Sequence, residues 1–501
     1  MDLTRRACLL LGGNACLALG LSGLGSLLFP EPAVVPALRL PRSTFCDWTN
    51  HCLARLSYGV TPQLRAQVQA IGIDAWLEAQ LADPTPEPDV ARRLRGYEMV
   101  DCEPSSCYEY RPEVIRAQLG AARCVRAYAS EHQLYEIMVE FWSDHFAIDM
   151  GKADCAYLIA DDERRVARAH AFGSFGELVR ASLSSPAMLW YLDGRDNRAG
   201  PGVTSPPNEN HARELLELHT LGVHGGYTQD DILQVARCLS GWTVRARHEF
   251  HLGSVVFEPE HHDPAAKTVL GTTIPAGLGA GDRDALCAIL VAHPATATHL
   301  STKLCQRFIS EQPPAAAVSA VAATFQSTRG DIRACLRTLI ATPAFRGASP
   351  GAGVGAGTDA AAAAGVALRG TLFKRPFHYL ISAMRSADAT LSDPAVLLDH
   401  LQILGQSPYR CATPAGYPLA QRHWQDGLWW RWRVAADLVG NRLAGIGVDA
   451  AALQQRCAGS AGLASHILGR TPAPAETQAL TGLDPDQALS VLLASPSFQR
   501  C

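Results

Sequence analysis

The chain has 501 residues, of which 48% are hydrophobic and 18% are charged, with a net charge of −4. Soluble domains carry about 25% charged residues, so this composition excludes a disordered chain and an electrostatic nucleic-acid binder. A mean hydropathy of +0.01 excludes a polytopic membrane protein. The 15 cysteines are too dilute for a small disulfide scaffold and numerous for a cytosolic enzyme, which raises the question of compartment.

Residues 1–30 have the pattern of an export signal. Arg5 and Arg6 precede an apolar, glycine-rich run that ends at Phe29, as in twin-arginine leaders. A general secretory leader with a chance Arg-Arg pair is the alternative, and an uncleaved leader would act as an N-terminal anchor. Both routes predict a periplasmic or extracellular protein. In that oxidising setting Cys102 and Cys107, which flank a Pro-Ser-Ser turn, are the best candidates for a local disulfide.

From Leu56 onward helical periodicity dominates, and only Phe250 to Phe257 shows strand-like alternation, suggesting one small hairpin. We therefore expect an all-α protein, one large domain of many short helices. The predicted helices cover residues 114–129, 131–147, 174–183, 208–222, 228–241, 281–292, 294–311, 314–328 and 330–342.

The chain divides by composition after the signal. Residues 31–55 form an N-terminal extension, and residues 56–346 form the first part of the helical domain. Residues 347–365 are almost entirely Ala, Gly, Ser and Pro, as in a flexible linker or inserted loop. Residues 366–501 contain further apolar helices that need a partner surface. We therefore expect them to pack on the first part, in one domain interrupted by a loop.

The first segment with candidate chemistry lies in the helix predicted for residues 131–147. Helical spacing places His145 on the apolar face, between Phe141 and Met138 and near Trp142. A core histidine with both ring nitrogens hydrogen-bonded is one interpretation. A catalytic or metal-binding histidine is the other.

The second segment is residues 207–222, where Asn208 or Asn210 would cap the helix. The helical wheel places Glu214 in the middle of the apolar stripe, with Glu217 on the side of Arg213. Because a buried, unpaired carboxylate costs several kcal/mol, Glu214 must be protonated, paired with arginine or bound to metal. A purely structural Glu–Arg network is the alternative to a functional site.

Two later segments carry weaker signals. In residues 258–271, His262 and Asp263 stand in what we expect to be an ordered loop, with Lys267 following. Solvated histidines are the alternative there. Four tryptophans lie between residues 424 and 432, and helical spacing predicts that Trp429 and Trp432 form a core pair.

These segments resemble a bacterial family called domain of unknown function 1800. The motifs that carry the resemblance are Phe141-Trp142-Ser143-Asp144-His145-Phe146, Pro207-Asn208-Glu209-Asn210-His211-Ala212-Arg213-Glu214-Leu215-Leu216-Glu217-Leu218, Gly225-Gly226-Tyr227-Thr228, Gly241-Trp242-Thr243, His262-Asp263-Pro264, Lys303-Leu304-Cys305 and Lys374-Arg375-Pro376. The chain departs from the family pattern at Ser143-Asp144 and in the Ala/Gly insert. The resemblance implies an exported protein whose gene commonly neighbours that of a sulfatase/phosphatase-like protein, but it assigns no reaction.

Two functions follow as hypotheses. The first is an extracytoplasmic enzyme that works by acid/base chemistry or with a transition metal, its identity unknown. Its catalytic residues would be His145, Glu214 and Glu217, its metal ligands His145, Glu214, His219, His262 and Asp263, and its binding residues Asn208, Arg213, Trp142 and Lys267. The second is a non-catalytic helical scaffold or partner subunit of the neighbouring exported sulfatase/phosphatase-like protein.

Overall fold

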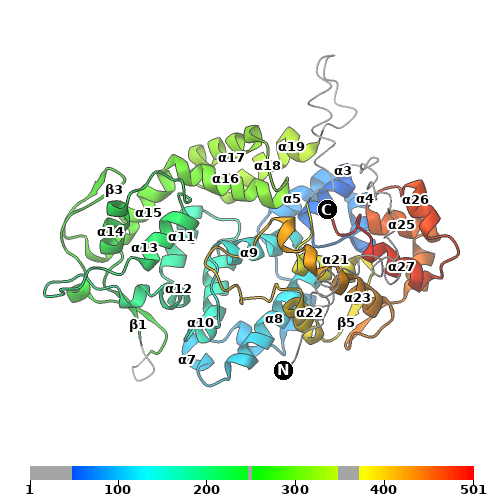
Figure 1. The fold of residues 1–501 in the computed structure, drawn as a ribbon, viewed down its shortest axis with the longest axis horizontal. Helices are drawn as coiled ribbons and strands as arrows, with labels where there is room; N and C mark the ends of the chain where they lie inside the picture. Colours follow the sequence, from blue (N-terminus) through cyan, green and yellow to red (C-terminus); the bar gives the residue numbers. More distant parts are fainter. Residues whose placement is uncertain (1–47, 246–250, 348–371) are drawn as a thin grey trace, which may run out of the picture. The chain divides into compact units, whose positions relative to one another are not determined.

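Short α-helices make up most of the chain, as the sequence predicts, and the expected all-α fold is confirmed (Figure 1). The computed structural model describes residues 48–245, 251–347 and 372–501. Outside the described residues lie the predicted export signal, residues 31–47 of the N-terminal extension and, apart from Gly347, the Ala/Gly insert. Those described all belong to one compact unit, Ser43–Cys501. The predicted domain boundaries remain predictions.

The first helices are α3 (Trp48–Leu56), α4 (Pro62–Ile71), α5 (Ile73–Leu81), α6 (Pro88–Leu94), α7 (Pro104–Cys107), α8 (Pro112–Ala129), α9 (Gln133–His145), α10 (Cys155–Asp162), α11 (Phe175–Leu183) and α12 (Pro186–Tyr191). The middle of the chain forms α13 (Asn210–Glu214), α14 (Gln229–Cys238), α15 (Asp282–Ala292), α16 (Pro294–Phe308), α17 (Ala315–Thr328), α18 (Ile332–Ala341) and α19 (Pro343–Arg346). The last part forms α21 (Pro376–Ser386), α22 (Ala395–Ile403), α23 (Leu428–Val439), α24 (Ala450–Arg456), α25 (Ser460–Leu468), α26 (Pro474–Ala479) and α27 (Pro485–Ala494).

Local sequence sets where several of these helices start. The Thr61 hydroxyl accepts a hydrogen bond from the backbone N–H of Leu64 at the start of α4. Thr228 and Asp231 form a reciprocal capping box at the start of α14, where the sequence predicted a helix start. Among the described residues no helix is both long and apolar enough to cross a membrane.

Within the described ranges, three small antiparallel pairs of strands interrupt the helices. They pair β1 (Trp242–Val244) with β2 (Val255–Phe257), β3 (Lys267–Val269) with β4 (Thr272–Ile274), and β5 (Thr390–Leu391) with β6 (Ile446–Gly447). The hairpin expected within residues 250–257 is replaced by β2, which pairs with the earlier strand β1. Phe250 lies outside the described residues.

Two π-helical turns follow α-helices directly. They are η2 (Glu163–Arg168), after α10, and η4 (Leu215–His219), after α13. Buried side chains of the second segment are spaced by four, at His211, Leu215 and His219, and Ala212 and Leu216 beside them are also buried. Glu214 is half-buried, so the expectation that it lies in the middle of a buried stripe is wrong. A π-turn changes the helical wheel on which that expectation rested, and such turns are frequent at functional sites.

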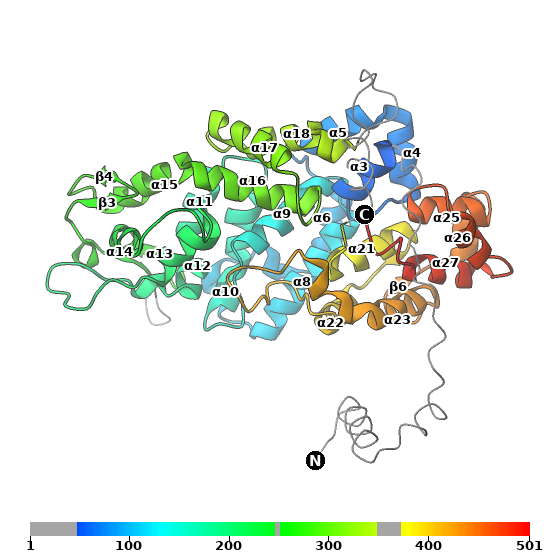
Figure 2. The same ribbon diagram turned by 45° about the horizontal axis from the view of Figure 1, so that its top comes forward.

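Helix packing brings distant segments together. Helices α16, α17 and α18 pack against one another, and α23 and α25 both pack against α27 (Figures 1 and 2). Helix α9 packs against η2, and every residue of α21 is buried. Residues of α9, η2 and α21 thus meet in the interior.

The predicted core pair on α23 is wrong. Trp429 and Trp432 are 64% and 49% exposed. The buried side of α23 instead carries Arg431, which donates to the carbonyl oxygen of Lys374 at 2.8 Å and to Gln499 Oε1 at 2.9 Å. Because the fully buried Arg431 occupies the inward side of α23, the two tryptophans face solvent. Helical spacing alone does not predict this arrangement.

A buried ion-pair network connects β3 to α15. Lys267 and His262 both hydrogen bond to Asp282 Oδ2, His262 at 3.0 Å, and all three side chains are at most 3% exposed. The second ring nitrogen of His262 lies 2.9 Å from the carbonyl oxygen of Ser240. Because buried charges without partners are costly, each member of this network depends on the others.

We expect Lys267→Met to lower the free energy of unfolding by about 3–5 kcal/mol, because it leaves the Asp282 carboxylate buried without its cation. Urea unfolding followed by circular dichroism measures the loss. The double variant Lys267→Met/Asp282→Leu should recover a large part of it. A single variant as stable as the wild type would contradict the structural role of the pair.

Candidate functional site

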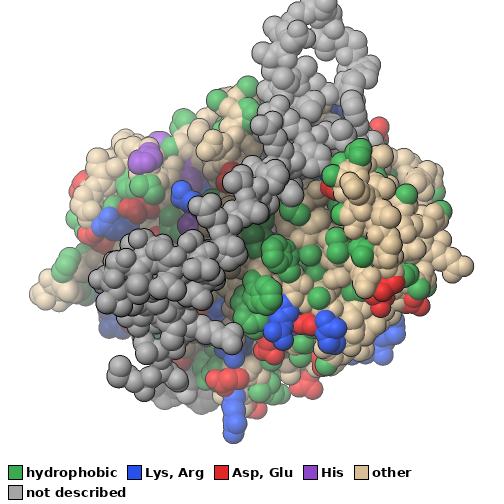
Figure 3. Space-filling view, turned by 45° about the vertical axis from the view of Figure 1, so that its right-hand side comes forward, with side chains coloured by type: hydrophobic (Ala, Val, Ile, Leu, Met, Phe, Trp, Pro, Cys, Tyr) green, Lys and Arg blue, Asp and Glu red, His purple; other side chains and the backbone are tan. Residues whose placement is uncertain are grey.

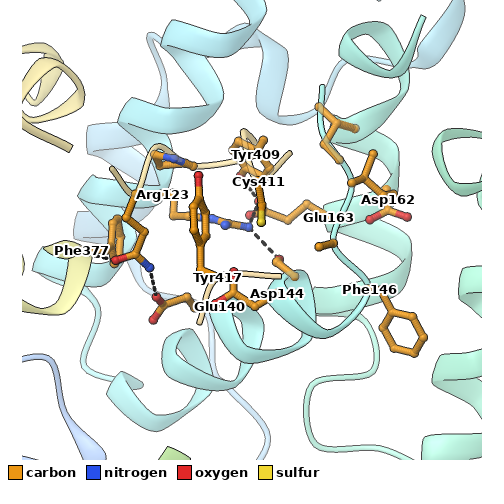
Figure 4. A pocket seen from close by; sticks show the side chains of 16 residues that line it. Arg123, Glu140, Asp144, Phe146, Asp162, Glu163, Phe377, Tyr409, Cys411 and Tyr417 are labelled. Atoms are coloured by element: carbon orange, nitrogen blue, oxygen red, sulfur yellow. Dashed lines mark hydrogen bonds and ion pairs between the residues drawn. The ribbon is translucent and has the colours of Figure 1, made fainter. Parts of the chain in front are cut away.

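A polar cavity lies where α9, α10, η2 and the segment 406–417 meet (Figure 4). Four acidic side chains line this cavity: Glu140, Asp144, Asp162 and Glu163. We therefore call it the carboxylate cavity. Its volume of about 30 Å³ holds about two water molecules. The cavity is therefore a site for water rather than for a large ligand.

Asp162 also lines a wider opening, which we call the outer cleft. Its volume is about 570 Å³, within the range of small-molecule sites. Residues of α7, α10, η2 and α12 line it, including Ser105, Asp161, Arg165 and Ser185. Asp162 lines both the carboxylate cavity and the outer cleft.

Arg375 holds two of the four carboxyl groups. It donates to Glu140 Oε1 at 2.7 Å and pairs with Asp144. Burial opposes ionisation of Glu140, but Arg375 and Arg307 outweigh it and lower the pKa of that carboxyl. For Asp144, burial prevails over Arg375 and raises the pKa. The segment 406–417 closes over this pair: a Cβ on Gly416 would lie 2.0 Å from the Asp144 carbonyl oxygen, so only glycine fits there.

Glu163 is held in its ionised form by several donors. Arg123 donates to its Oε2 at 2.9 Å and Arg168 to its Oε1 at 2.8 Å, while the Tyr409 hydroxyl also donates to it. Burial alone would raise the pKa of Glu163, but Arg123, Arg168 and Arg126 lower it to about 2. Glu163 is thus a fixed anion at physiological pH.

Asp162 is the opposite case although it is the adjacent residue. Its side chain is buried, its Oδ1 atom has no hydrogen-bond partner, and no ion pair reaches it within the described residues. Burial raises the pKa of Asp162 to about 7, against the hydrogen bond from Ser185 that favours the ionised form. Figure 4 places its carboxyl group at the side of the cavity, away from Glu140 and Asp144. Asp162 can therefore gain and lose a proton near neutral pH.

The structure brings two predicted site residues together in a second buried group. His145 Nε2 lies 3.0 Å from the carbonyl oxygen of His219, and its Nδ1 lies 2.8 Å from Lys303 Nζ. Both ring nitrogens of His145 are therefore hydrogen-bonded, as the core interpretation predicts. Burial, followed by Lys303, keeps the pKa of His145 well below its usual value, and burial lowers the pKa of Lys303 to about 8. Trp142 packs beside His145 and donates from Nε1 to the carbonyl oxygen of Ala171 at 3.1 Å.

The predicted residues on α13 and η4 lie elsewhere. Arg213 pairs with Glu209 at 3.0 Å and with Glu217 at 3.6 Å, and all three are half-buried. Burial raises the pKa of Glu214, and the neighbouring Glu217 adds to the effect. Asn208 Oδ1 accepts a hydrogen bond from the backbone N–H of Asn210, the first residue of α13, but the N-cap position is Glu209, whose side chain forms no capping bond.

The remaining predicted residues are tied to other partners. His262 and Lys267 bind Asp282, and Asp263 accepts a hydrogen bond from Arg237 at 2.6 Å. No group of three or more His, Cys, Asp or Glu side chains with metal-site geometry occurs in the described part of the chain. The metal ligands predicted from the sequence are therefore distributed over separate places and do not fit one metal centre.

The predicted disulfide is not formed in this structure. Cys102 and Cys107 are free thiols. Burial raises the pKa of the Cys107 thiol, and its hydrogen bond with Cys102 adds to the effect. The two residues are thus neighbours, with Cys107 buried at the end of α7 and Cys102 half-buried in the turn before it.

Sequence reasoning missed Asp162, Glu163 and Asp282. The run Asp161-Asp162-Glu163-Arg164-Arg165 has the composition of a solvated charged face. The signal available in the sequence is its place at the end of the apolar segment Cys155–Ala160, which α10 buries. Asp282 stands in the first turn of a predicted helix, where an acidic residue is ordinary.

Adjacent carboxyl groups with opposite pKa shifts predict opposite changes of stability. With a pKa near 7 when folded and 3.8 when unfolded, Asp162 costs stability as pH rises from about 4 to 7, so Asp162→Asn should gain up to about 4 kcal/mol at pH 8. Glu163, with a pKa lowered to about 2, contributes stability above pH 4.5, so Glu163→Gln should lose about 3 kcal/mol there.

Urea unfolding of both variants at pH 4.5 and pH 8 measures these changes. The gain from Asp162→Asn should shrink toward zero at the lower pH. An Asp162→Asn protein less stable than the wild type at pH 8 would contradict the assignment of a buried, unpaired carboxyl.

Comparison with known proteins gives one match. The family model described as "Protein of unknown function (DUF1800)" matches residues 51–500. Neither the curated proteins nor the solved structures contain a match to this chain. Since the family model covers nearly the whole chain, the protein belongs to the DUF1800 family.

Proposed function

We propose that this protein is an exported hydrolytic enzyme in which Asp162 acts as the general acid/base. The observation that carries the proposal is the position of this carboxyl group, which is buried without an ion pair and lines both a water-sized cavity and a ligand-sized cleft. Carboxyl groups with pKa values near the working pH are the most effective proton-transfer groups. Export rests on the Arg-Arg leader pattern of residues 1–30.

The arrangement supports a simple division of roles. A substrate in the outer cleft would meet the hydroxyl groups of Ser105, Ser184 and Ser185 and the ion pairs of Asp161 with Arg164 and Arg165. Ionised Asp162 would take a proton from a water molecule of the carboxylate cavity as the water oxygen attacks the substrate. The protonated carboxyl would then return that proton to the leaving group, which restores the starting state.

The neighbouring residues support this cycle by fixing charge. Glu163 stays ionised among its three arginines and so disfavours a second negative charge on Asp162. The acid/base role that the sequence suggested for Glu214 and Glu217 is thus proposed for Asp162 instead. The proposed cycle uses only protein side chains and water.

The second candidate function is the scaffold or partner subunit of a neighbouring exported sulfatase/phosphatase-like protein. One observation favours it: Trp429, Trp430 and Trp432 are exposed together on α23. Aromatic side chains are enriched at protein interfaces. Co-purification of a second chain that is lost on Trp429→Ser/Trp432→Ser would support this candidate.

Purified protein tested on p-nitrophenyl acetate, phosphate and glucoside provides the direct test of the enzyme. We expect hydrolysis of at least one probe, with a pH profile that bends near pH 7, and a loss of about 100-fold or more in Asp162→Asn. Arg337→Ala, which removes an exposed ion pair with Glu78, serves as the control with unchanged rate. Hydrolysis that persists in Asp162→Asn, or rates no higher than buffer on all three probes, would contradict the proposal.

A further inference from the structure

A second cleft, formed by other helices than those around Asp162, is lined by basic rather than acidic side chains. It lies between α4, the end of α24 and α25, and its volume is about 410 Å³. We call it the arginine cleft. Its polar lining comes from Asn50, Arg65, Gln69, Arg456, His466 and Arg470, with Ser465 and Thr471 adding hydroxyl groups. No described residue that lines it is Asp or Glu.

Two of the three arginines are paired with carboxylates that do not line the cleft. Arg470, whose side chain is 9% exposed, pairs with both oxygens of Glu476 at 2.7 and 2.8 Å. Arg456 pairs with Asp388 at 2.6 Å. The carboxylates of these two pairs do not line the cleft, so they orient the guanidinium groups without occupying it.

Arg65 crosses the cleft from the opposite wall. It donates to Asn50 Oδ1 at 2.8 Å and to the carbonyl oxygen of His466 at 3.4 Å, which links α4 to α25. Burial, then the charges of Arg65 and Arg456, lower the pKa of His466 to about 4. His466 is therefore neutral at physiological pH.

On the face that Figure 3 brings forward, acidic and basic side chains are interspersed where the chain is described. This face therefore lacks the broad positive surface that would bind a long polyanion. Three guanidinium groups from separate elements around one concave site fit a compact anion instead.

We propose that the arginine cleft binds a small molecule through a phosphate or sulfate group. The planar guanidinium donates paired hydrogen bonds that match tetrahedral oxyanions, and arginine is preferred at such sites. The amide groups of Asn50 and Gln69 and the hydroxyl groups of Ser465 and Thr471 would contact the remainder of the ligand. This site is independent of the acid/base function proposed for Asp162.

Isothermal titration calorimetry of the full chain with inorganic phosphate and with inorganic sulfate, at ionic strength held constant with sodium chloride, tests the proposal. We expect saturable binding of at least one of the two ions, and the tighter one identifies the group that the ligand carries. Arg456→Gln, at a side chain that is half-exposed, should keep the fold and weaken binding at least tenfold.

Arg442→Gln is the matched control, because Arg442 is also an exposed arginine paired with an aspartate but lies outside the cleft. It should bind the ion as the wild type does. Heats equal to those of chloride alone would overturn the proposal. Equal weakening in both variants would also overturn it, since it would show that general surface charge governs binding.

Discussion

The interior of this protein depends on an ion-pair network in which arginines from α8, η2 and the start of α21 meet carboxylates of α9 and η2. Arg168 bridges Glu136 and Glu163, and Arg375 bridges Glu140 and Asp144. Removing such charges from water costs several kcal/mol per ion unless each is paired and hydrogen-bonded. The network therefore fixes how these helices lie against one another, and it sets the electrostatic surroundings of every group in the carboxylate cavity.

Asp162 acquires its character from its place beside this network. The arginines are engaged by Glu136, Glu140, Asp144 and Glu163, and Asp162 is left with Ser185. The pKa values of the consecutive residues Asp162 and Glu163 are thus shifted in opposite directions. The π-turn that begins at Glu163 contributes, because it changes the direction of successive side chains where α10 ends. Pairing this carboxyl with an arginine would make the fold more stable. A functional role would explain why Asp162 has no ion pair.

The helices were largely predictable from periodicity and caps. The helix predicted for 174–183 is α11 (Phe175–Leu183), and that for 294–311 is α16 (Pro294–Phe308). Features that depend on tertiary partners were not predictable. The exposure of Trp429 follows from the buried Arg431, whose acceptors come from Lys374 and Gln499.

The candidate site shows the same limit. His145 was correctly placed on an apolar face, but its partner Lys303 is 158 residues away in the sequence. Asp162 was overlooked because a charged run at a helix end ordinarily faces solvent. Whether such a run is buried depends on what packs over it, and here Tyr409, which is 246 residues from Glu163 in the sequence, donates to the Glu163 carboxylate.

The central claim is that Asp162 remains protonated until near neutral pH. Carbon-13 NMR of protein labelled at the aspartate carboxyl carbons measures this directly, with the Asp162 signal assigned as the one missing in Asp162→Asn. The account predicts a titration midpoint near pH 7 for that signal. A midpoint at or below pH 4, as for an exposed or paired aspartate, would contradict it.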